Sequence, residues 1–240
     1  AIDKFEFYSN FLAENNWDDV RGNNRRIRQA KYAKSLFENP VEVDIVPIKH
    51  INTDYAEYRP KLNAEENIMY FTSKRPGGSS DILDDQGEYY EDIYVSKKKM
   101  GVWTEPQLVN DLINTTESSS CLYLSPDGEH MFLSMVNNDQ KLGHLGRGIY
   151  EARLDGNHWN NPEFLDQKVN SKYWETYASL DIYGNVLFFV SDREGGYGGR
   201  DIWMIKKLPS GEWAEPQNLG EPINTEYDEE SPYLLSLIHI

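Results

Sequence analysis

Residues 51–57 read Ile51-Asn52-Thr53-Asp54-Tyr55-Ala56-Glu57, and the chain repeats this pattern. Two further copies are Val169-Asn170-Ser171-Lys172-Tyr173-Trp174-Glu175 and Ile223-Asn224-Thr225-Glu226-Tyr227-Asp228-Glu229, and a weaker one is Ile113-Asn114-Thr115. The copies begin at residues 51, 113, 169 and 223, so about 54–62 residues separate one from the next. A period near this length is typical of a unit of four short strands. The sequence therefore predicts a protein built from internal repeats.

Each copy is followed by the same succession of short elements, in which a turn leads into an apolar strand. The turns and strands are Glu66-Asn67 with residues 68–72, Asp127-Gly128 with residues 131–134, and Tyr183-Gly184 with residues 186–190. Further short strands are expected at residues 92–95, 148–150 and 201–204. Each unit closes with a tryptophan and, three residues later, a proline, which is expected to end an outer edge strand because proline cannot donate to a ladder. These elements predict a mostly β chain: a partial β-propeller with three full four-stranded blades and the start of a fourth, preceded by a short α-helical segment.

Three signatures follow one another at this blade spacing. They are the Ile-Asn-Thr-x-Tyr-x-Glu openings, Ser125-Pro126-Asp127-Gly128 before a strand, and the run Ser191-Asp192-Arg193-Glu194-Gly195-Gly196-Tyr197-Gly198-Gly199-Arg200-Asp201-Ile202-Trp203. In these residues the chain resembles the TolB-type, WD40-like propeller repeats of bacterial envelope proteins. The resemblance extends over residues 51–233, although the second blade lacks the element of arginine and paired glycines. It implies a propeller that docks other proteins.

The first forty residues have a different pattern. Ile27, Ala30, Ala33 and Phe37 fall on one face of a helix, which predicts a helix over residues 24–38 that ends before Pro40. An earlier helix is expected over residues 2–15. The domains are therefore a helical segment at 1–40 and an incomplete propeller at 41–240, with blades from about residues 51, 113, 169 and 223. The apolar residues 234–240 interrupt the repeat and are expected to be foreign sequence or the mark of a truncation.

The junction at residues 30–41 resembles that of Bacteroidetes-type envelope proteins. In those proteins tetratricopeptide helices precede the propeller and an OmpA-type peptidoglycan-binding domain follows it. The resemblance implies that residues 1–40 are the end of a tetratricopeptide-like region. It also implies that peptidoglycan is reached only through a domain that this chain does not contain.

Residues that recur once per blade are expected to be structural. An active site needs a few unlike groups in one place, whereas a repeated residue closes the same hydrogen bonds in each blade. A carboxylate near a glycine-rich turn can accept backbone N–H bonds, and a neighbouring arginine can then pair with it. The residues assigned to this repeat motif are Asn52, Tyr55, Glu57, Arg75, Asp92, Trp103, Trp159, Glu175, Asp192, Arg193, Asp201, Trp213, Asn224, Tyr227 and Glu229. No catalytic residue, cofactor or metal ligand is expected.

An acidic insertion lies in the first blade, at Asp81, Asp84, Asp85, Glu88, Glu91 and Asp92. Oxygen-rich loops can hold calcium. With Gly87 at the sixth position of a calcium loop, however, Ile82 and Ile93 occupy the first and twelfth positions, where carboxylates are required. A solvated loop is the favoured interpretation.

Charge and composition exclude several classes of protein. Lys and Arg number 24 against 40 Asp and Glu, a net charge of −16, which disfavours nucleic-acid binding. No apolar run is long enough for a transmembrane helix. The single cysteine, Cys121, permits no internal disulfide and is expected to be a small buried hydrophobe.

Two classes of function remain. The first is a non-enzymatic scaffold in the Gram-negative cell envelope, periplasmic or associated with the outer membrane, whose partners are other envelope proteins and which can be linked to secretion machinery. The alternative is a glycan-binding or glycan-acting propeller, indicated by the acidic insertion and by aromatics such as Tyr89, Tyr90, Trp174 and Tyr197. The resemblance also allows the gating propeller of a serine peptidase, but the chain has no Gly-x-Ser-x-Gly elbow and no His-Glu-x-x-His motif.

Overall fold

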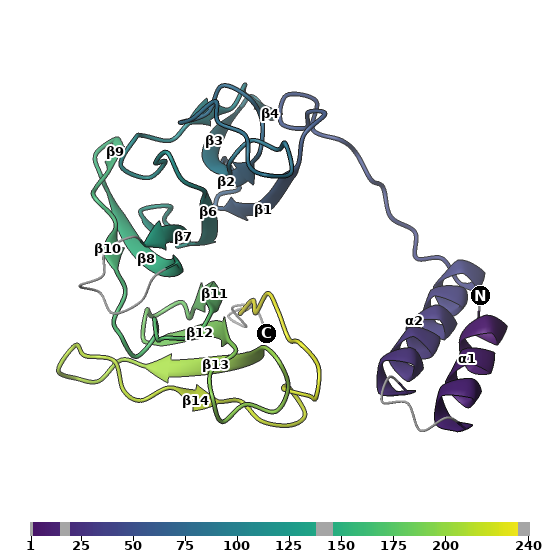
Figure 1. Cartoon of the computed structure of the whole chain (residues 1–240). Helices are drawn as coiled ribbons and strands as arrows, with labels where there is room; N and C mark the ends of the chain where they lie inside the picture. Colours follow the sequence, from purple (N-terminus) through teal and green to yellow (C-terminus); the bar gives the residue numbers. More distant parts are fainter. Residues whose placement is uncertain (1, 15–19, 138–145, 235–240) are drawn as a thin grey trace. The chain divides into compact units, whose positions relative to one another are not determined.

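The chain divides into two compact units, Ala1–Pro47 and Ile48–Ile240 (Figure 1). A computed structural model describes residues 2–14, 20–137 and 146–234. The division falls seven residues after the boundary expected from Pro40. Of the expected foreign tail at 234–240, all but Leu234 lies outside the described residues.

The first unit is a pair of helices, α1 (Ile2–Glu14) and α2 (Val20–Glu38), which pack against each other. Leu12 and Ile27 are buried between them, and the amide of Asn23 donates to the carbonyl of Phe5 at 2.5 Å. The second helix begins four residues before its expected start. Phe37 shares the predicted face with Ile27 but is 88% exposed, because a pair of helices can bury only the part of each that meets the other.

The second unit consists of three antiparallel sheets (Figure 1). The first contains β1 (Glu57–Leu62), β2 (Ile68–Ser73), β3 (Asp92–Lys99), β4 (Val102–Trp103) and β5 (Gln107–Leu108). The second contains β6 (Ser119–Leu124), β7 (His130–Asn137), β8 (Gly146–Asp155), β9 (His158–Trp159) and β10 (Glu163–Phe164). The third contains β11 (Glu175–Leu180), β12 (Val186–Ser191), β13 (Asp201–Lys206) and β14 (Gln217–Asn218). The prediction of a mostly β, antiparallel chain is confirmed.

All three sheets share one arrangement of their main strands. An inner strand (β1, β6 or β11) is followed by two strands of six to ten residues, and a two-residue outer strand (β5, β10 or β14) pairs with the second of these. The outer strands begin directly after Pro106, Pro162 and Pro216. Shorter strands do end before two of these prolines, as expected: β4 at Trp103 and β9 at Trp159. The outer strands that follow the prolines were not expected. A proline fits equally well immediately before an edge strand, where no ladder bond requires its missing N–H.

Tight turns join the inner strands to their neighbours. Asp181 accepts hydrogen bonds through its Oδ1 from the backbone N–H groups of Asn185 at 2.6 Å and Val186 at 2.9 Å. Gly184 has a φ of 72°, a left-handed conformation that glycine adopts without steric cost. In the first sheet Asn63 replaces the aspartate and accepts from the N–H groups of Asn67 and Ile68. Local side-chain bonds therefore fix the register of the hairpins, at the turns that the sequence predicts.

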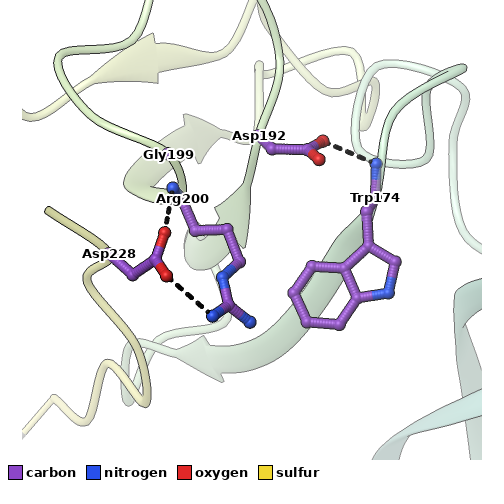
Figure 2. Close-up of a pocket in the computed structure, with 5 residues that line it drawn as sticks. All are labelled: Trp174, Asp192, Gly199, Arg200 and Asp228. Carbon is purple, nitrogen blue, oxygen red and sulfur yellow. Dashed lines mark hydrogen bonds and ion pairs between the residues drawn. The ribbon is translucent and has the colours of Figure 1, made fainter.

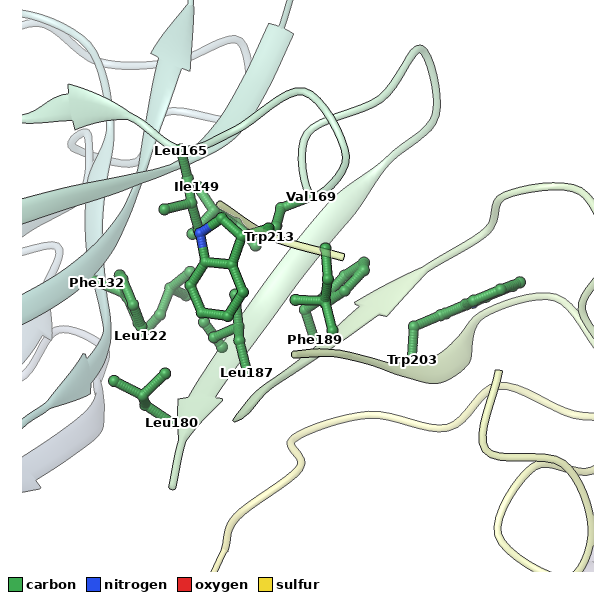
Figure 3. Close-up of a cluster of buried hydrophobic side chains, with 12 residues drawn as sticks. Leu122, Phe132, Ile149, Leu165, Val169, Leu180, Leu187, Phe189, Trp203 and Trp213 are labelled. Carbon is green, nitrogen blue, oxygen red and sulfur yellow. The ribbon is translucent and has the colours of Figure 1, made fainter. Parts of the chain in front are cut away.

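The sheets pack face to face, and the inner strands of successive sheets are neighbours. One apolar cluster lies between the first and second sheets and includes Tyr70, Ile93, Met131 and Leu133. Another lies between the second and third sheets; Figure 3 shows Phe132 and Leu165 on one side and Leu187 and Phe189 on the other. Burial of these side chains is the main force that holds the sheets together, at roughly 1.5–3 kcal/mol for each large apolar side chain.

Cys121 provides a test of this packing. The thiol lies in β6 with no exposed surface, and burial raises its pKa to about 12. Because the thiolate is the reactive species, we expect iodoacetamide at pH 8 to alkylate the folded protein at least ~1,000-fold more slowly than the urea-unfolded protein. Mass spectrometry over time measures both rates. Similar rates in the folded and unfolded protein would contradict the burial.

Candidate functional site

The repeated asparagines connect each sheet to the start of the next unit. Asn170 accepts from the N–H of Ile149 at 2.8 Å through Oδ1, and its Nδ2 donates to the carbonyls of Ile149 and Leu165, both at 2.8 Å. Asn114 makes the same three bonds one sheet earlier, with Ile93 and Val109. Each side-chain amide therefore hydrogen-bonds to backbone groups in the third strand of one sheet and in the segment that follows the outer strand of that sheet.

Asn224 makes the corresponding contacts on the third sheet. Its side chain bonds the N–H and the carbonyl of Ile202 at 2.9 and 2.8 Å, and also Asn218 Oδ1 at 2.8 Å. Asn224 is fully buried, whereas the matching Asn52 is exposed. The side chain of this motif asparagine is thus hydrogen-bonded to the third strand of a sheet in three of the four copies.

The repeated glutamates lie at the start of the inner strands. Glu175 has no exposed surface and accepts from the N–H of Ser171 at 3.0 Å, the Ser171 hydroxyl at 2.6 Å and the Ser191 hydroxyl at 2.9 Å. Arg193 Nη2 lies 3.0 Å from Glu175 Oε1. These bonds tie the opening motif to the end of β12.

The first sheet has the same arrangement around Glu57. That carboxylate accepts from Thr53 and from the Ser73 hydroxyl, and Arg75 Nη2 lies 3.3 Å away. Burial alone would raise the pKa of Glu57, but the hydrogen bonds from Thr53 and Ser73 and the charge of Arg75 outweigh it, so the pKa is lowered. Glu57 is therefore held as an acceptor and is not poised to give or take a proton near neutral pH.

The two arginines stack on aromatic rings. The Arg193 guanidinium lies 4.7 Å from the ring centre of Phe189 and 5.5 Å from that of Trp203, and Arg75 lies 4.8 Å from that of Tyr94. Burial lowers the pKa of Arg193. Both arginines also donate to backbone carbonyls of their opening motifs, Arg75 to Ile51 and Arg193 to Val169. In each case the carboxylate that pairs with the arginine is the repeated glutamate.

Asp92 and Asp201 close the glycine-rich turns instead. Asp92 accepts from the N–H and the hydroxyl of Ser79 at 2.9 and 2.6 Å, and burial raises its pKa. Asp201 Oδ2 accepts from the N–H of Tyr197 at 2.6 Å. A Cβ atom on Gly196 would lie 2.0 Å from Asp201 Oδ2, so this close approach requires glycine.

The second sheet lacks this arrangement. Ser119 occupies the position of the glutamate in the other sheets. Its cross-strand neighbour is Met135, whereas the neighbours of the two glutamates are Ser73 and Ser191. Gly148 replaces the aspartate, and a Cβ there would lie 2.6 Å from the ring of Phe164. The departure of the second repeat from the motif is therefore accommodated by different packing.

Two of the three closing tryptophans pack back onto the preceding sheet. Trp159 is buried, and its Nε1 donates to the Tyr70 hydroxyl at 3.3 Å. Trp213 is also buried and belongs to the cluster between the second and third sheets (Figure 3). Trp103 is only partly buried, beside Met69 and Phe71 on the outer face of the first sheet.

The remaining motif residues make local contacts. Tyr55 is 46% exposed and meets the ring of Tyr89 edge-on at 5.9 Å. Asp192 Oδ1 accepts from the N–H of Trp174 at 2.8 Å. The fourth copy repeats the turn of the others: Glu229 accepts from the N–H of Thr225 at 3.0 Å, and Tyr227 donates its N–H to the Thr225 hydroxyl at 3.2 Å.

A surface hollow of about 400 Å³ lies beside this fourth copy (Figure 2). Trp174, Asp192, Gly199, Arg200 and Asp228 line it. Arg200 Nη2 lies 2.9 Å from Asp228, its Nη1 lies 2.7 Å from Glu230, and its guanidinium is 5.1 Å from the Trp174 ring centre. The charge of Arg200 is therefore neutralised within the chain. The hollow lies between the third sheet and the segment that follows it.

Most carboxylates of the acidic insertion are also engaged. Glu88 pairs with Lys74 at 2.5 Å, Glu91 pairs with Arg147 and accepts from the Tyr58 hydroxyl, and Asp84 accepts from the N–H groups of Gln86 and Glu88. Within the described ranges no group of three His, Cys, Asp or Glu side chains is placed to hold a metal ion. The described helices include none that is long and apolar enough to cross a membrane.

Sequence reasoning missed one set of residues, which the backbone brings together. Arg59, Tyr177 and Ser231 each lie two residues after a repeated glutamate, and their φ angles are 53°, 49° and 57°. All three line a cavity of about 330 Å³ beside the inner strands. The residue type differs in each repeat, so only the shared offset from the glutamate could have indicated them.

The fold and these contacts define a repeat protein of stacked antiparallel sheets in which most motif residues connect neighbouring segments. No family model matches the chain, and no curated protein matches it. TolB from Acinetobacter baumannii is similar in structure at 15% identity and a TM-score of 0.45, over 69% of this chain and 33% of that one.

A proposed TolB from Agrobacterium tumefaciens is similar at 14% identity and a TM-score of 0.43, over 74% of this chain and 55% of that one. A post-proline cleaving enzyme from Rickettsia typhi is similar at 12% identity and a TM-score of 0.38, over 67% of this chain and 21% of that one. The chain thus spans less than two thirds of each of these structures.

Proposed function

We propose that the chain is a non-enzymatic scaffold for protein–protein interaction, built as three full blades of a β-propeller and the start of a fourth. The observation that supports this proposal is the use of its motif side chains. Glu57, Glu175, Asn114 and Asn170 all bond to neighbouring segments of the chain. Catalysis requires unlike groups that converge on a substrate position, whereas these groups recur and are satisfied internally.

The proposed location is the Gram-negative envelope, in the periplasm or at the outer membrane. The support is the motif resemblance over residues 51–233. In the same proposal, residues 1–40 are the end of a tetratricopeptide-like region, and an OmpA-type domain outside this chain reaches peptidoglycan. The partners are other envelope proteins.

The competing function is glycan binding. Its support is the 37% exposed ring of Trp174 at the hollow in Figure 2, since sugars stack on such rings. Arg200 already lies over that ring and pairs with Asp228, so a sugar would have to displace both contacts.

Photo-crosslinking in the bacterium that encodes the chain tests the scaffold. A benzoylphenylalanine at Tyr183, which is 76% exposed, should capture periplasmic or outer-membrane proteins, and the same group at buried Phe189 should capture none. Purified protein should hydrolyse neither peptide nor glycan substrates. Turnover of a glycan, or saturable binding on a glycan array that Trp174→Ala abolishes, would overturn the scaffold assignment.

A further inference from the structure

We propose that the cavity beside the inner strands binds a carboxylate group of a partner polypeptide, held by Arg59 and Lys61. This inference rests on the proposed scaffold function and specifies what its partner presents. The inner cavity, as we call it, has a volume of about 330 Å³ and is lined by Arg59, Pro60, Lys61, Tyr177, Pro232 and Tyr233, among others. That volume is at the lower end of the range for ligand pockets and suits one or two residues of a peptide.

The two cations of the inner cavity have no acidic partner among the described residues. Arg59 donates from Nη1 to the Ser120 hydroxyl at 2.7 Å and stacks on Tyr177 at 4.6 Å, but none of the described carboxylates lies within 4.0 Å of it. Lys61 makes neither a hydrogen bond nor an ion pair with any described side chain, although it is partly buried. The arrangement is unusual for a chain with a net charge of −16, in which most partly buried cations are paired.

A bound anion would compensate both groups. Desolvation penalises a charged group that has no counter-charge, and here burial lowers the pKa of Lys61. Arg59 and Lys61 line the same cavity, and the charge of Arg59 also lowers the pKa of Lys61. Arg59 already gives one nitrogen to Ser120, and the guanidinium still presents further N–H groups in the planar fork that matches a carboxylate.

The backbone gives a second, independent indication. Arg59, Tyr177 and Ser231 occupy the same place in three repeats and share the left-handed conformation. This conformation is costly for residues other than glycine, and such strain tends to persist where a side chain must be aimed. The glutamates two residues earlier are identical, whereas these three residues differ in type. The repeats thus hold side chains of different types in the same backbone conformation beside one cavity. Such an arrangement is suited to recognition of a ligand.

The rest of the lining favours a polypeptide as the source of the anion. Tyr177 and Tyr233 supply rings, and Leu122, Ala178 and two prolines supply apolar surface, a composition that resembles the core of a protein interface. The strongly negative net charge of the chain would repel a polyanion such as nucleic acid more than a single carboxylate.

Nuclear magnetic resonance titration of the whole chain tests the site. The probes are acetyl-Gly-Asp-Gly amide, which carries a side-chain carboxylate, and acetyl-Gly-Gly-Gly, which carries a free terminal carboxylate; acetyl-Gly-Asn-Gly amide is the neutral control. We expect at least one carboxylate peptide to shift the Arg59 and Lys61 resonances saturably, with a dissociation constant on the order of 1 mM. The preferred probe identifies the source of the carboxylate.

Paired variants isolate the two cations. R59Q/K61Q should weaken binding at least ~10-fold, and K49Q/K99Q, which removes the same charge from exposed positions, should change it by less than ~2-fold. R59K/K61R retains both charges and should restore most of the affinity. Thermal unfolding midpoints identify any variant that fails to fold, in which case shifts at Lys61 in the wild-type titration decide the question.

Equal binding of the neutral peptide would overturn the proposal, as would equal binding by R59Q/K61Q. If inorganic phosphate displaces the peptide at a lower concentration than the peptide itself requires, the site is a phosphate site and the peptide assignment is wrong. The scaffold proposal has a separate readout, because crosslinking at Tyr183 does not depend on Arg59 or Lys61. Crosslinks that persist in R59Q/K61Q cells while the peptide fails to bind would reject the inner cavity alone.

Discussion

Glu175→Ala should lower the free energy of unfolding by about 3–5 kcal/mol, since removing one partner of a buried ion pair leaves the other charge uncompensated. Glu175 has no exposed surface. Its loss would leave the Arg193 guanidinium, which is also almost fully buried, without a carboxylate partner. The hydroxyls of Ser171 and Ser191 would lose an acceptor as well. Urea unfolding followed by tryptophan fluorescence measures the change.

The fourth copy of the motif supplies the matched control. Glu229 accepts from Thr225 in the same local turn but is only partly buried. Glu229→Ala should therefore cost about 1 kcal/mol or less, the usual net value for a hydrogen bond. Equal losses in the two variants would show that the contacts of Glu175 with β12 contribute nothing beyond the local turn.

Asn170→Ala should cost about 3 kcal/mol, because it removes three hydrogen bonds and leaves buried backbone groups unsatisfied. The groups affected are the N–H and the carbonyl of Ile149 and the carbonyl of Leu165. These groups join β8 to the segment after the outer strand β10. We expect the midpoint of urea unfolding to fall, and hydrogen exchange at Ile149 to become faster than at other buried amides of β8.

Asn52→Ala is the control for this prediction. Asn52 occupies the same motif position but is exposed. Its replacement should change stability by less than about 0.5 kcal/mol, as surface substitutions usually do. If both substitutions cost the same, the motif asparagine stabilises its own turn and not the junction between sheets.

Much of the fold could be predicted from the sequence. The repeats placed the hairpin turns at Glu66, Gly128 and Gly184, each of which has a positive φ. They also located the second and third strands of each sheet, because turn residues and apolar runs are local properties of the chain. The outer strands β5, β10 and β14, which begin directly after Pro106, Pro162 and Pro216, were not located. Two-residue strands have too little pattern of their own, and their pairing with the third strand decides where they lie.

The candidate site was less predictable. The sequence flagged Arg75 and Arg193 but did not say which carboxylate each arginine meets. The structure pairs them with Glu57 and Glu175, at the start of the inner strands. Arg59 and Lys61 gave no signal, because neither residue recurs in the other repeats. Their cavity depends on three left-handed residues far apart in the chain.

The sequence alone determined the repeat, the mostly β class and the motif residues, since repeated local chemistry is visible wherever it is copied along one chain. Only the tertiary structure decided which side chain each motif residue meets. The amide of Asn170 bonds Ile149, and Arg59 stacks on Tyr177 of another sheet. Such contacts depend on strand register and on how one sheet packs against the next, and these are set by burial of the apolar faces between sheets, to which distant segments contribute together.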